Sequence, residues 1–277
     1  MTEMTPNRRG FLMTSLIAGL TLATTRAEAQ AIHTDADGLD AHEVQIPVAD
    51  GSLPGYAAKP HGPGPFPTVL VIEEIFGVHE YIKDVCRRLA KQGYLAVAPE
   101  LYARLADLSK MSDIQQIFHD VILKAPDAAM LSDLDHTATW ASTHDGDPGR
   151  LAVMGFCRGG RDTWLYAAHN PNLKAAVAWY GPVGGPTSPI QPATAGSVAA
   201  HINCPLLGLY GAKDDSIPVA DVQAAAAAAR RAGKTAEIII YPDAGHAFHA
   251  DYRPSYVRDA AEDGWKRASA WLKKYDF

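Results

Sequence analysis

One cysteine in this chain has neighbours that suit a catalytic nucleophile. Residues 155–160 read Gly-Phe-Cys-Arg-Gly-Gly, and they follow a strand-like apolar run and open a helical pattern. A nucleophile between a strand and a helix sits on a strained turn, so its close neighbours must lack Cβ atoms, as Gly155 and Gly159 do. Backbone N–H groups at the helix start stabilise an oxyanion and favour a thiolate. The pattern therefore predicts Cys157 as a nucleophile; the alternative is a buried structural cysteine.

Such a nucleophile needs an acid and a base, which follow it along the chain in that order. Asp214 and Asp215 follow an apolar run, and we expect Asp214 to be the acid; helix capping is the alternative for the pair. His246 follows the last apolar run, and Gly245 gives the turn freedom to aim its ring, which predicts His246 as the base. His246 and His249 could instead form half of a metal site, but no helical carboxylate–histidine motif accompanies them.

The elements that must position these residues alternate along the chain. Apolar runs predict strands over 42–48, 53–59, 68–72, 94–98, 151–155, 175–180, 206–210 and 237–241. Helical spacing predicts helices over 81–91, 113–124, 128–142, 159–169, 218–232 and 256–274. This alternation predicts an α/β fold, with a mostly parallel sheet and helices on both faces, as one domain over 30–277. Residues 182–197 are rich in Pro, Gly, Ser and Thr and predict either a loop over the site or a disordered segment.

Composition narrows the class of protein. The 277 residues are 47% apolar and 20% charged, with a formal net charge of −6, so nothing in the charge favours nucleic acid or an anionic membrane surface as a partner. There are three cysteines, a small and odd number that does not suit a disulfide framework. No two of them have the C-x-x-C spacing of a zinc site. Cys86 and Cys204 are interpreted as packing residues.

The N-terminus has the composition of a targeting segment. Residues 7–13 read Asn-Arg-Arg-Gly-Phe-Leu-Met and resemble a twin-arginine export signal. An apolar run over 11–23 and the A-x-A pattern over 27–29 complete a predicted signal peptide over 1–29, cut before Gln30. The run is too short to be a stable membrane anchor; an uncleaved anchor or a disordered tail is the alternative. The pattern predicts the twin-arginine export machinery as a partner and a periplasmic or secreted protein.

Four segments closely resemble the dienelactone hydrolase family of the α/β-hydrolase superfamily, and the resemblance extends over about residues 42–275. The segments are Glu-Glu-Ile-Phe-Gly at 73–77, Pro-Glu-Leu-Tyr-Ala-Arg at 99–104, the cysteine segment at 155–160, and Ala-Gly-His-Ala-Phe-His at 244–249. The resemblance implies an α/β-hydrolase fold and hydrolysis of a small ester or lactone through a thioester, with no cofactor. It places the family's cysteine, aspartate and histidine on Cys157, Asp214 and His246.

The resemblance also implies supporting roles. The family's glutamate falls on Glu74, which would hydrogen-bond the resting thiol until substrate displaces it; a surface carboxylate at a strand end is the alternative. The oxyanion hole would be the backbone N–H groups of Ile75 and Arg158. The family's substrate-binding arginine falls on Arg104, which would hold a substrate carboxylate, with Tyr102 in the same segment; a surface salt bridge is the alternative. Ala250 occupies the position of a second family arginine, and nearby Arg253 is the candidate substitute.

Together these patterns predict a cysteine-dependent hydrolase of a small ester or lactone, with carboxylate-bearing dienelactones among the candidate substrates. Three alternatives stay open: a carboxylesterase or thioesterase of the same fold, a glutaminase-type amidotransferase, and a non-catalytic thiol-sensing or binding protein. We expect a small-molecule substrate as partner, and a monomer or a small homo-oligomer.

Overall fold

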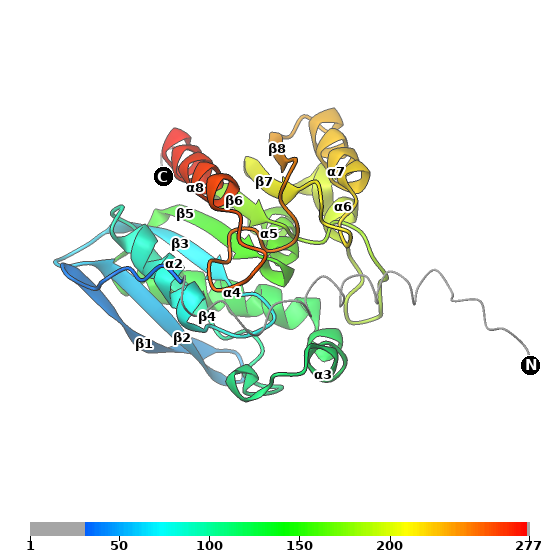
Figure 1. Ribbon diagram of the computed structural model, residues 1–277. Coiled ribbons are helices and arrows are strands. Elements are labelled where there is room, and N and C mark those ends of the chain that lie inside the picture. Colours follow the sequence, from blue (N-terminus) through cyan, green and yellow to red (C-terminus); the bar gives the residue numbers. More distant parts are fainter. Residues whose placement is uncertain (1–30, 276–277) are drawn as a thin grey trace, which may run out of the picture.

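A computed structural model describes residues 31–275 of the protein (Figure 1). Its strands are β1 (Leu39–Val48), β2 (Gly51–Pro60), β3 (Phe66–Ile72), β4 (Leu95–Pro99), β5 (Gly146–Phe156), β6 (Leu173–Trp179), β7 (Leu206–Gly211) and β8 (Ala236–Tyr241). Its α-helices are α2 (Glu80–Ala90), α3 (Ile114–Asp120), α4 (Asp127–Ser142), α5 (Arg158–His169), α6 (Ala195–Val198), α7 (Val219–Arg231) and α8 (Arg258–Lys274). Short 3₁₀ turns are η1 (Leu108–Lys110), η2 (Ile122–Lys124) and η3 (Ala199–His201).

The strands form one sheet in the order β1-β2-β4-β3-β5-β6-β7-β8. The first two strands run antiparallel to their neighbours, and all other pairs are parallel. The helices α2 and α8 lie on one face of the sheet, and α4, α5 and α7 on the other (Figure 1). This arrangement confirms the predicted α/β-hydrolase fold class.

The centre of the sheet explains why these sequences form strands. Residues 69–72 of β3 and 152–154 of β5 are fully buried, as expected for strands covered by helices on both faces. Each large apolar side chain buried in this way stabilises the fold by about 1.5–3 kcal/mol. Ile72 pairs with Gly155, and Phe156 pairs with Trp179. The loops that follow β3, β5 and β6 therefore meet at one edge of the sheet.

Two segments depart from the predicted elements. The helix predicted over 113–124 is divided into α3 and η2, because Val121 has φ −122° and ψ −67°, outside the helical region. The segment 182–197 ends in the short helix α6, where Thr194 and Ser197 each cap the other's backbone N–H. Its earlier residues have no regular structure and lie over the carboxyl ends of the strands (Figure 1).

Two further expectations concern export and the thiols. The predicted signal peptide over 1–29 lies outside the described residues. Within 31–275, none of the helices has both the length and the apolar character to cross a bilayer.

Cys86, Cys157 and Cys204 are all buried free thiols.

Candidate active site

Cys157 occupies a strained turn between β5 and α5. Its backbone has φ 54° and ψ −116°, a conformation that side-chain-bearing residues rarely adopt, and it is the N-cap residue of α5. Its N–H donates to the carbonyl oxygen of Trp179 at 3.0 Å, which fastens the turn to the end of β6. Strain of this kind persists only where the surrounding contacts impose it, and it is common at functional sites.

The neighbouring glycines allow the backbone segments around this turn to touch. A Cβ atom on Gly155 would lie 2.1 Å from the carbonyl oxygen of Gly159 and 2.5 Å from Oγ1 of Thr163. A Cβ atom on Gly159 would lie 2.4 Å from the carbonyl oxygens of Ile72 and Glu73. These close approaches bring the start of α5 against the end of β3. Ile75, a predicted oxyanion-hole donor, lies just after this strand.

We therefore expect Gly155→Ala to destabilise the protein, because the new methyl group collides with backbone rather than with a movable side chain. The expected loss is about 2–3 kcal/mol in the free energy of unfolding, measured by urea denaturation. Gly149→Ala is the matched control, since the nearest atom to its added Cβ would be a side-chain oxygen of Asp147 at 3.3 Å. Equal stability of the two variants would show that the turn tolerates a side chain at Gly155.

The structure joins the three predicted catalytic residues in one hydrogen-bonded chain. Nε2 of His246 lies 3.1 Å from Sγ of Cys157, and Nδ1 of His246 lies 2.7 Å from Oδ2 of Asp214. The other carboxylate oxygen of Asp214 accepts from the N–H of Ser216 at 3.0 Å and from its hydroxyl at 2.5 Å. The neighbouring Asp215 is exposed to solvent. Of the two aspartates left open by the sequence, Asp214 is the one that contacts the imidazole.

Burial and charge have opposite effects on the pKa values of His246 and Asp214. Burial alone would lower the pKa of His246, but its interactions with Cys157 and Asp214 outweigh burial and raise the pKa to about 10. Burial likewise opposes the charge of Asp214, but the charge and hydrogen bond of His246 lower the pKa of that carboxyl group. The arrangement therefore favours a protonated imidazole between a carboxylate and the sulfur, as nucleophilic catalysis by cysteine requires.

Two backbone N–H groups lie at the places expected of an oxyanion hole. Arg158 is the first residue of α5, where backbone N–H groups have no partner within the helix. Ile75 lies in the loop after β3, and its N–H donates to no residue within 31–275. Both residues flank the turn that carries Cys157, so their N–H groups are available to a substrate oxygen.

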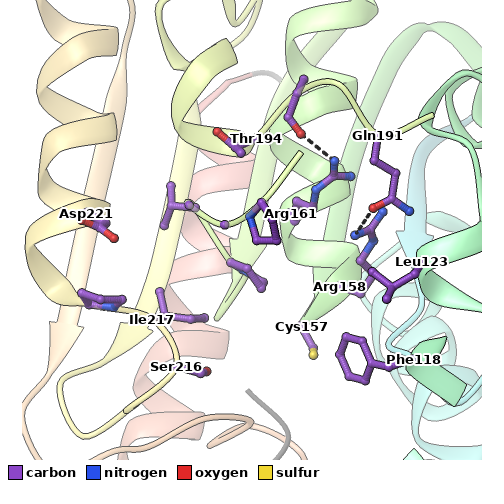
Figure 2. Close-up of a pocket in the computed structure, with 17 residues that line it drawn as sticks. Phe118, Leu123, Cys157, Arg158, Arg161, Gln191, Thr194, Ser216, Ile217 and Asp221 are labelled. Atoms are coloured by element: carbon purple, nitrogen blue, oxygen red, sulfur yellow. Dashed lines mark hydrogen bonds between the residues drawn. The ribbon is translucent and has the colours of Figure 1, made fainter. Parts of the chain in front are cut away.

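Cys157 opens onto a mostly apolar cavity of about 180 Å³ (Figure 2). In this view the sulfur lies beside Phe118 and Arg158, with Ile217 and Asp221 on the opposite side. The walls come from distant parts of the chain: Phe118, Leu123, Arg158, Arg161, Pro182, Val183, Gly184, Gly185, Pro186, Gln191, Ala193, Thr194, Ser216, Ile217, Pro218 and Asp221. Eight of these residues, 182–186, 191 and 193–194, belong to the segment 182–197, which was predicted to be a loop over the site.

Glu74 has partners other than the thiol. Its Oε2 accepts from the hydroxyl of Tyr252 at 2.7 Å and lies 3.5 Å from Nε2 of His79. Its Oε1 has no hydrogen-bond partner in the described chain, so Glu74 does not hydrogen-bond Cys157. The expectation that Glu74 holds the resting thiol is wrong for this structure, in which the sulfur faces His246. Tyr252 and His79 belong to no motif, so neither contact could be predicted from the sequence.

The guanidinium of Arg253 explains why Glu74 stays charged in this buried place. Burial would raise the pKa of Glu74, but the charge of Arg253, followed by His79 and Tyr252, lowers it to about 2. Arg253 is itself buried, with Nε donating to the Tyr252 hydroxyl at 3.0 Å and its charge 4.8 Å from the ring centre of Phe76. Arg253 is not among the residues that line the cavity, and its expected contact with a substrate stays a prediction.

The low pKa of Glu74 predicts a pH-dependent contribution to stability. Its pKa of about 2 in the folded protein lies below the ordinary glutamate value of 4.5, so its contribution to stability is complete above pH 4.5 and is lost as the pH falls toward 2. We expect the stability difference between the wild type and Glu74→Gln to narrow by about 2–3 kcal/mol from pH about 5 to about 2.5, measured by urea denaturation. Glu262→Gln, which alters an exposed carboxylate, is the control. A difference that stays constant over this range would contradict the prediction.

Two residues assigned by the resemblance lie away from the cavity walls. Arg104 donates to both oxygens of Asp50 and forms a two-bond pair with Asp133 at 2.7 and 2.9 Å. Its N–H donors therefore bind carboxylates of the protein itself. This agrees with the alternative interpretation of Arg104 as part of a salt bridge. Tyr102 is buried in a small apolar cluster with Ile75 and Leu108. Neither residue is among those that line the cavity, and their expected roles in substrate binding stay predictions.

The second histidine of the 246–249 segment does not form a metal site with the first. His249 is buried against Phe156, Trp179 and Trp265, and its Nδ1 lies 2.6 Å from the hydroxyl of Tyr81. Among residues 31–275, no group of three or more His, Cys, Asp or Glu side chains is arranged to hold a metal ion.

Comparison with known proteins identifies the family. The model of the dienelactone hydrolase family matches residues 53–276. The chain belongs to the dienelactone hydrolase family. A relative from Methylorubrum extorquens, named "Putative carboxymethylenebutenolidase", is 54% identical over 275 residues, which cover 99% of this chain and 94% of the relative. A relative of the same name from Escherichia coli (strain K12) is 49% identical and covers 95% of this chain and 98% of its own length.

A solved structure extends the match to three dimensions. The crystal structure described as a "Putative Dienelactone Hydrolase" from Klebsiella pneumoniae has a TM-score of 0.84 and 53% sequence identity, and it covers 86% of this chain and 99% of its own. The resemblance predicted from four short segments is therefore confirmed at the level of the family. As a member of the dienelactone hydrolase family with this fold, the protein is a hydrolase acting on ester bonds.

Proposed function

We propose that this dienelactone hydrolase family member cleaves a small ester or lactone by acyl transfer to Cys157. The observation that carries the proposal is the hydrogen-bonded chain from Sγ through His246 to Asp214, at a strained turn that opens onto an apolar cavity. A buried structural cysteine needs neither the imidazole at 3.1 Å nor the positive φ of the turn.

The proposed reaction has two acyl transfers. His246 takes the proton of the thiol, and the sulfur attacks the carbonyl carbon, so that the negative charge on the carbonyl oxygen meets the N–H groups of Ile75 and Arg158. The tetrahedral intermediate collapses to a thioester as His246 gives its proton to the leaving alkoxide. His246 then removes a proton from water, the resulting hydroxide attacks the thioester, and the thiol is released again. In a lactone, alcohol and acid remain parts of one product.

The cavity supports a small acyl group as the substrate. Its volume of about 180 Å³ is below the range of about 300–1,000 Å³ that is usual for drug-sized ligands. Most of its walls are apolar, which favours a short hydrocarbon segment next to the scissile carbonyl. The dienelactone-type substrates implied by the family fit this size, and so do short-chain esters and thioesters.

The decisive experiment is the capture of the acyl-enzyme. Wild type and Cys157→Ser are incubated with p-nitrophenyl esters, small lactones and dienelactones, then quenched in acid and digested. We expect turnover of at least one class by the wild type, and a mass increase equal to the acyl group on the peptide that contains Cys157. An adduct on another residue, or no turnover across the panel, would overturn the proposal.

We also propose that residues 1–29 direct export to the periplasm by the twin-arginine route. The support is the Arg-Arg pair, the short apolar run and the A-x-A pattern of the sequence. We expect the mature protein in the periplasmic fraction, beginning at Gln30, and retention in the cytoplasm when Arg8 and Arg9 are both changed to lysine. Unchanged export of that double variant would rule out the twin-arginine route.

A further inference from the structure

The charged side chains of the cavity differ in how well the protein satisfies them. Three residues of the lining carry charge: Arg158, Arg161 and Asp221. Asp221 comes from the first turn of α7, across the cavity from the two arginines (Figure 2). A ligand in the cavity therefore meets positive charge on the side where Cys157 lies and negative charge on the far side.

Four of the five N–H donors of Arg161 are already bonded within the protein. Its Nη1 donates to Asp127 at 2.8 Å and to Asp162 at 2.7 Å, and its Nη2 donates to Asp127 at 2.8 Å and to the carbonyl oxygen of Ala193 at 2.7 Å. These four short bonds tie α5 to α4 and to the segment before α6. Arg161 is therefore a structural residue of the cavity wall.

Arg158 has only long contacts. Its Nη1 lies 3.5 Å from Oε1 of Gln191, its Nη2 lies 3.5 Å from Asp127, and its Nε lies 3.4 Å from Asp162. Charge-assisted bonds of this type are normally about 2.7–2.9 Å long. The Nε atom is buried and has no hydrogen-bond partner within residues 31–275. Arg161 already bonds Asp127 and Asp162 at shorter distances, so Arg158 makes the weaker contact with each of these carboxylates.

The surroundings keep Arg158 turned toward the cavity. Gln191 donates through Nε2 to the carbonyl oxygens of Ile122 at 2.6 Å and Ala125 at 2.8 Å, which leaves its Oε1 facing the guanidinium. Asp127 and Asp162 lie behind the guanidinium and do not line the cavity. An anion that enters the cavity thus meets the cation first and the carboxylates behind it.

We propose that the side chain of Arg158 binds an anionic group of the acyl substrate, and so selects esters or lactones that carry a carboxylate near the scissile carbonyl. The inference rests on the proposed function, and it assigns to Arg158 the task that the resemblance assigns to Arg104. A carboxylate can accept two bonds from the guanidinium, which replaces three long contacts with short ones. Arg158 directly follows Cys157 in the chain and both residues line the cavity, so we expect the scissile carbonyl and the carboxylate to belong to one small acyl group.

The test compares an anionic ester with its neutral counterpart. The probes are p-nitrophenyl hydrogen adipate and p-nitrophenyl methyl adipate, which differ only at the far end, where the first carries a carboxylate and the second a neutral methyl ester. The readout is the ratio of their kcat/KM values, because damage to the nucleophile or to the oxyanion hole lowers both values and cancels in the ratio. We expect the wild type to prefer the anion, and Arg158→Gln to lower the ratio by about 10–100-fold, chiefly through a higher KM for the anion.

Three further variants sharpen the comparison. Arg158→Lys keeps the charge without the paired donors, and we expect a ratio between those of the wild type and Arg158→Gln. Arg267→Gln removes an exposed arginine paired with Asp263 on α8, and we expect it to leave the ratio unchanged. If Arg104→Gln lowers the ratio and Arg158→Gln does not, Arg104 binds the anion and the inference is wrong.

The two proposals fail in different ways. If the wild type hydrolyses the methyl adipate ester but shows no preference for the anion, the inference on Arg158 is overturned and the acyl-transfer proposal stands. If the wild type hydrolyses neither these esters nor any of the wider panel, the proposed function itself is overturned. Far-ultraviolet circular dichroism of each variant confirms that a lost preference does not come from unfolding.

Discussion

Replacement of Cys157 by alanine is expected to lower kcat/KM by at least about 10³-fold for every ester that the protein hydrolyses. The variant keeps His246 and Asp214 but has no atom that can form the thioester. Residual catalysis can come only from binding and from the two backbone N–H groups at Ile75 and Arg158. Steady-state hydrolysis of p-nitrophenyl esters measures the loss, and release of p-nitrophenol in the first turnover shows whether acylation still occurs.

The other two cysteines provide matched controls. Cys86 and Cys204 are buried apolar-site thiols, and burial raises the pKa of both, to about 12 for Cys204. We expect Cys86→Ala and Cys204→Ala to keep kcat/KM within about twofold of the wild type, since neither side chain lines the cavity. We also expect iodoacetamide to label the wild type and both controls, but not Cys157→Ala. A large loss of activity in either control, with Cys157→Ala active, would place the nucleophile elsewhere.

The turn that carries Cys157 was predictable because its signals are local. A buried strand, two glycines two residues either side of the cysteine, and a helix start all lie within residues 151–169, and the structure places β5 and α5 there. The same holds for the sheet, whose strands are apolar runs that helices cover on both sides. Local patterns of this kind fix the element type and its order along the chain.

The partners of the charged residues were not predictable, because they come from distant parts of the sequence. Arg104 meets Asp50 and Asp133, which lie 54 and 29 residues away. Glu74 meets Tyr252 across 178 residues. Nothing near Arg104 or Glu74 in the sequence marks these contacts, so a role carried over from similar segments could not account for them. The motifs mark these residues in the sequence, but the contacts of each one depend on the assembled fold.

The position of Glu74 also changes how the nucleophile is controlled. A carboxylate bonded to the thiol would oppose thiolate formation, since like charges repel. Here the hydroxyl of Tyr252, which accepts from Arg253, donates to that carboxylate, and the sulfur faces His246. The structure thus has the thiol and the imidazole in contact without any displacement of Glu74.

Asp214→Asn is expected to reduce kcat/KM by about 10²–10⁴-fold while leaving the fold intact. An amide at this position donates a hydrogen bond where the carboxylate accepted one, so Nδ1 of His246 must become the acceptor. The imidazole proton then sits on Nε2, which can no longer take the proton of Cys157. The loss of the negative charge at 2.7 Å also lowers the pKa of His246. Ester hydrolysis as a function of pH measures both effects.

Asp215→Asn separates this mechanism from a general loss of negative charge in the same loop. The substitution is chemically identical and lies one residue further along, but the side chain of Asp215 is exposed, whereas that of Asp214 is buried against His246. We expect Asp215→Asn to keep activity within about twofold, with an unchanged pH profile. Equal losses in the two variants would mean that the loop needs charge rather than one oriented acceptor. A larger loss in Asp215→Asn would require the loop to rearrange on substrate binding, and Asp214 would then hold His246 only in the empty enzyme.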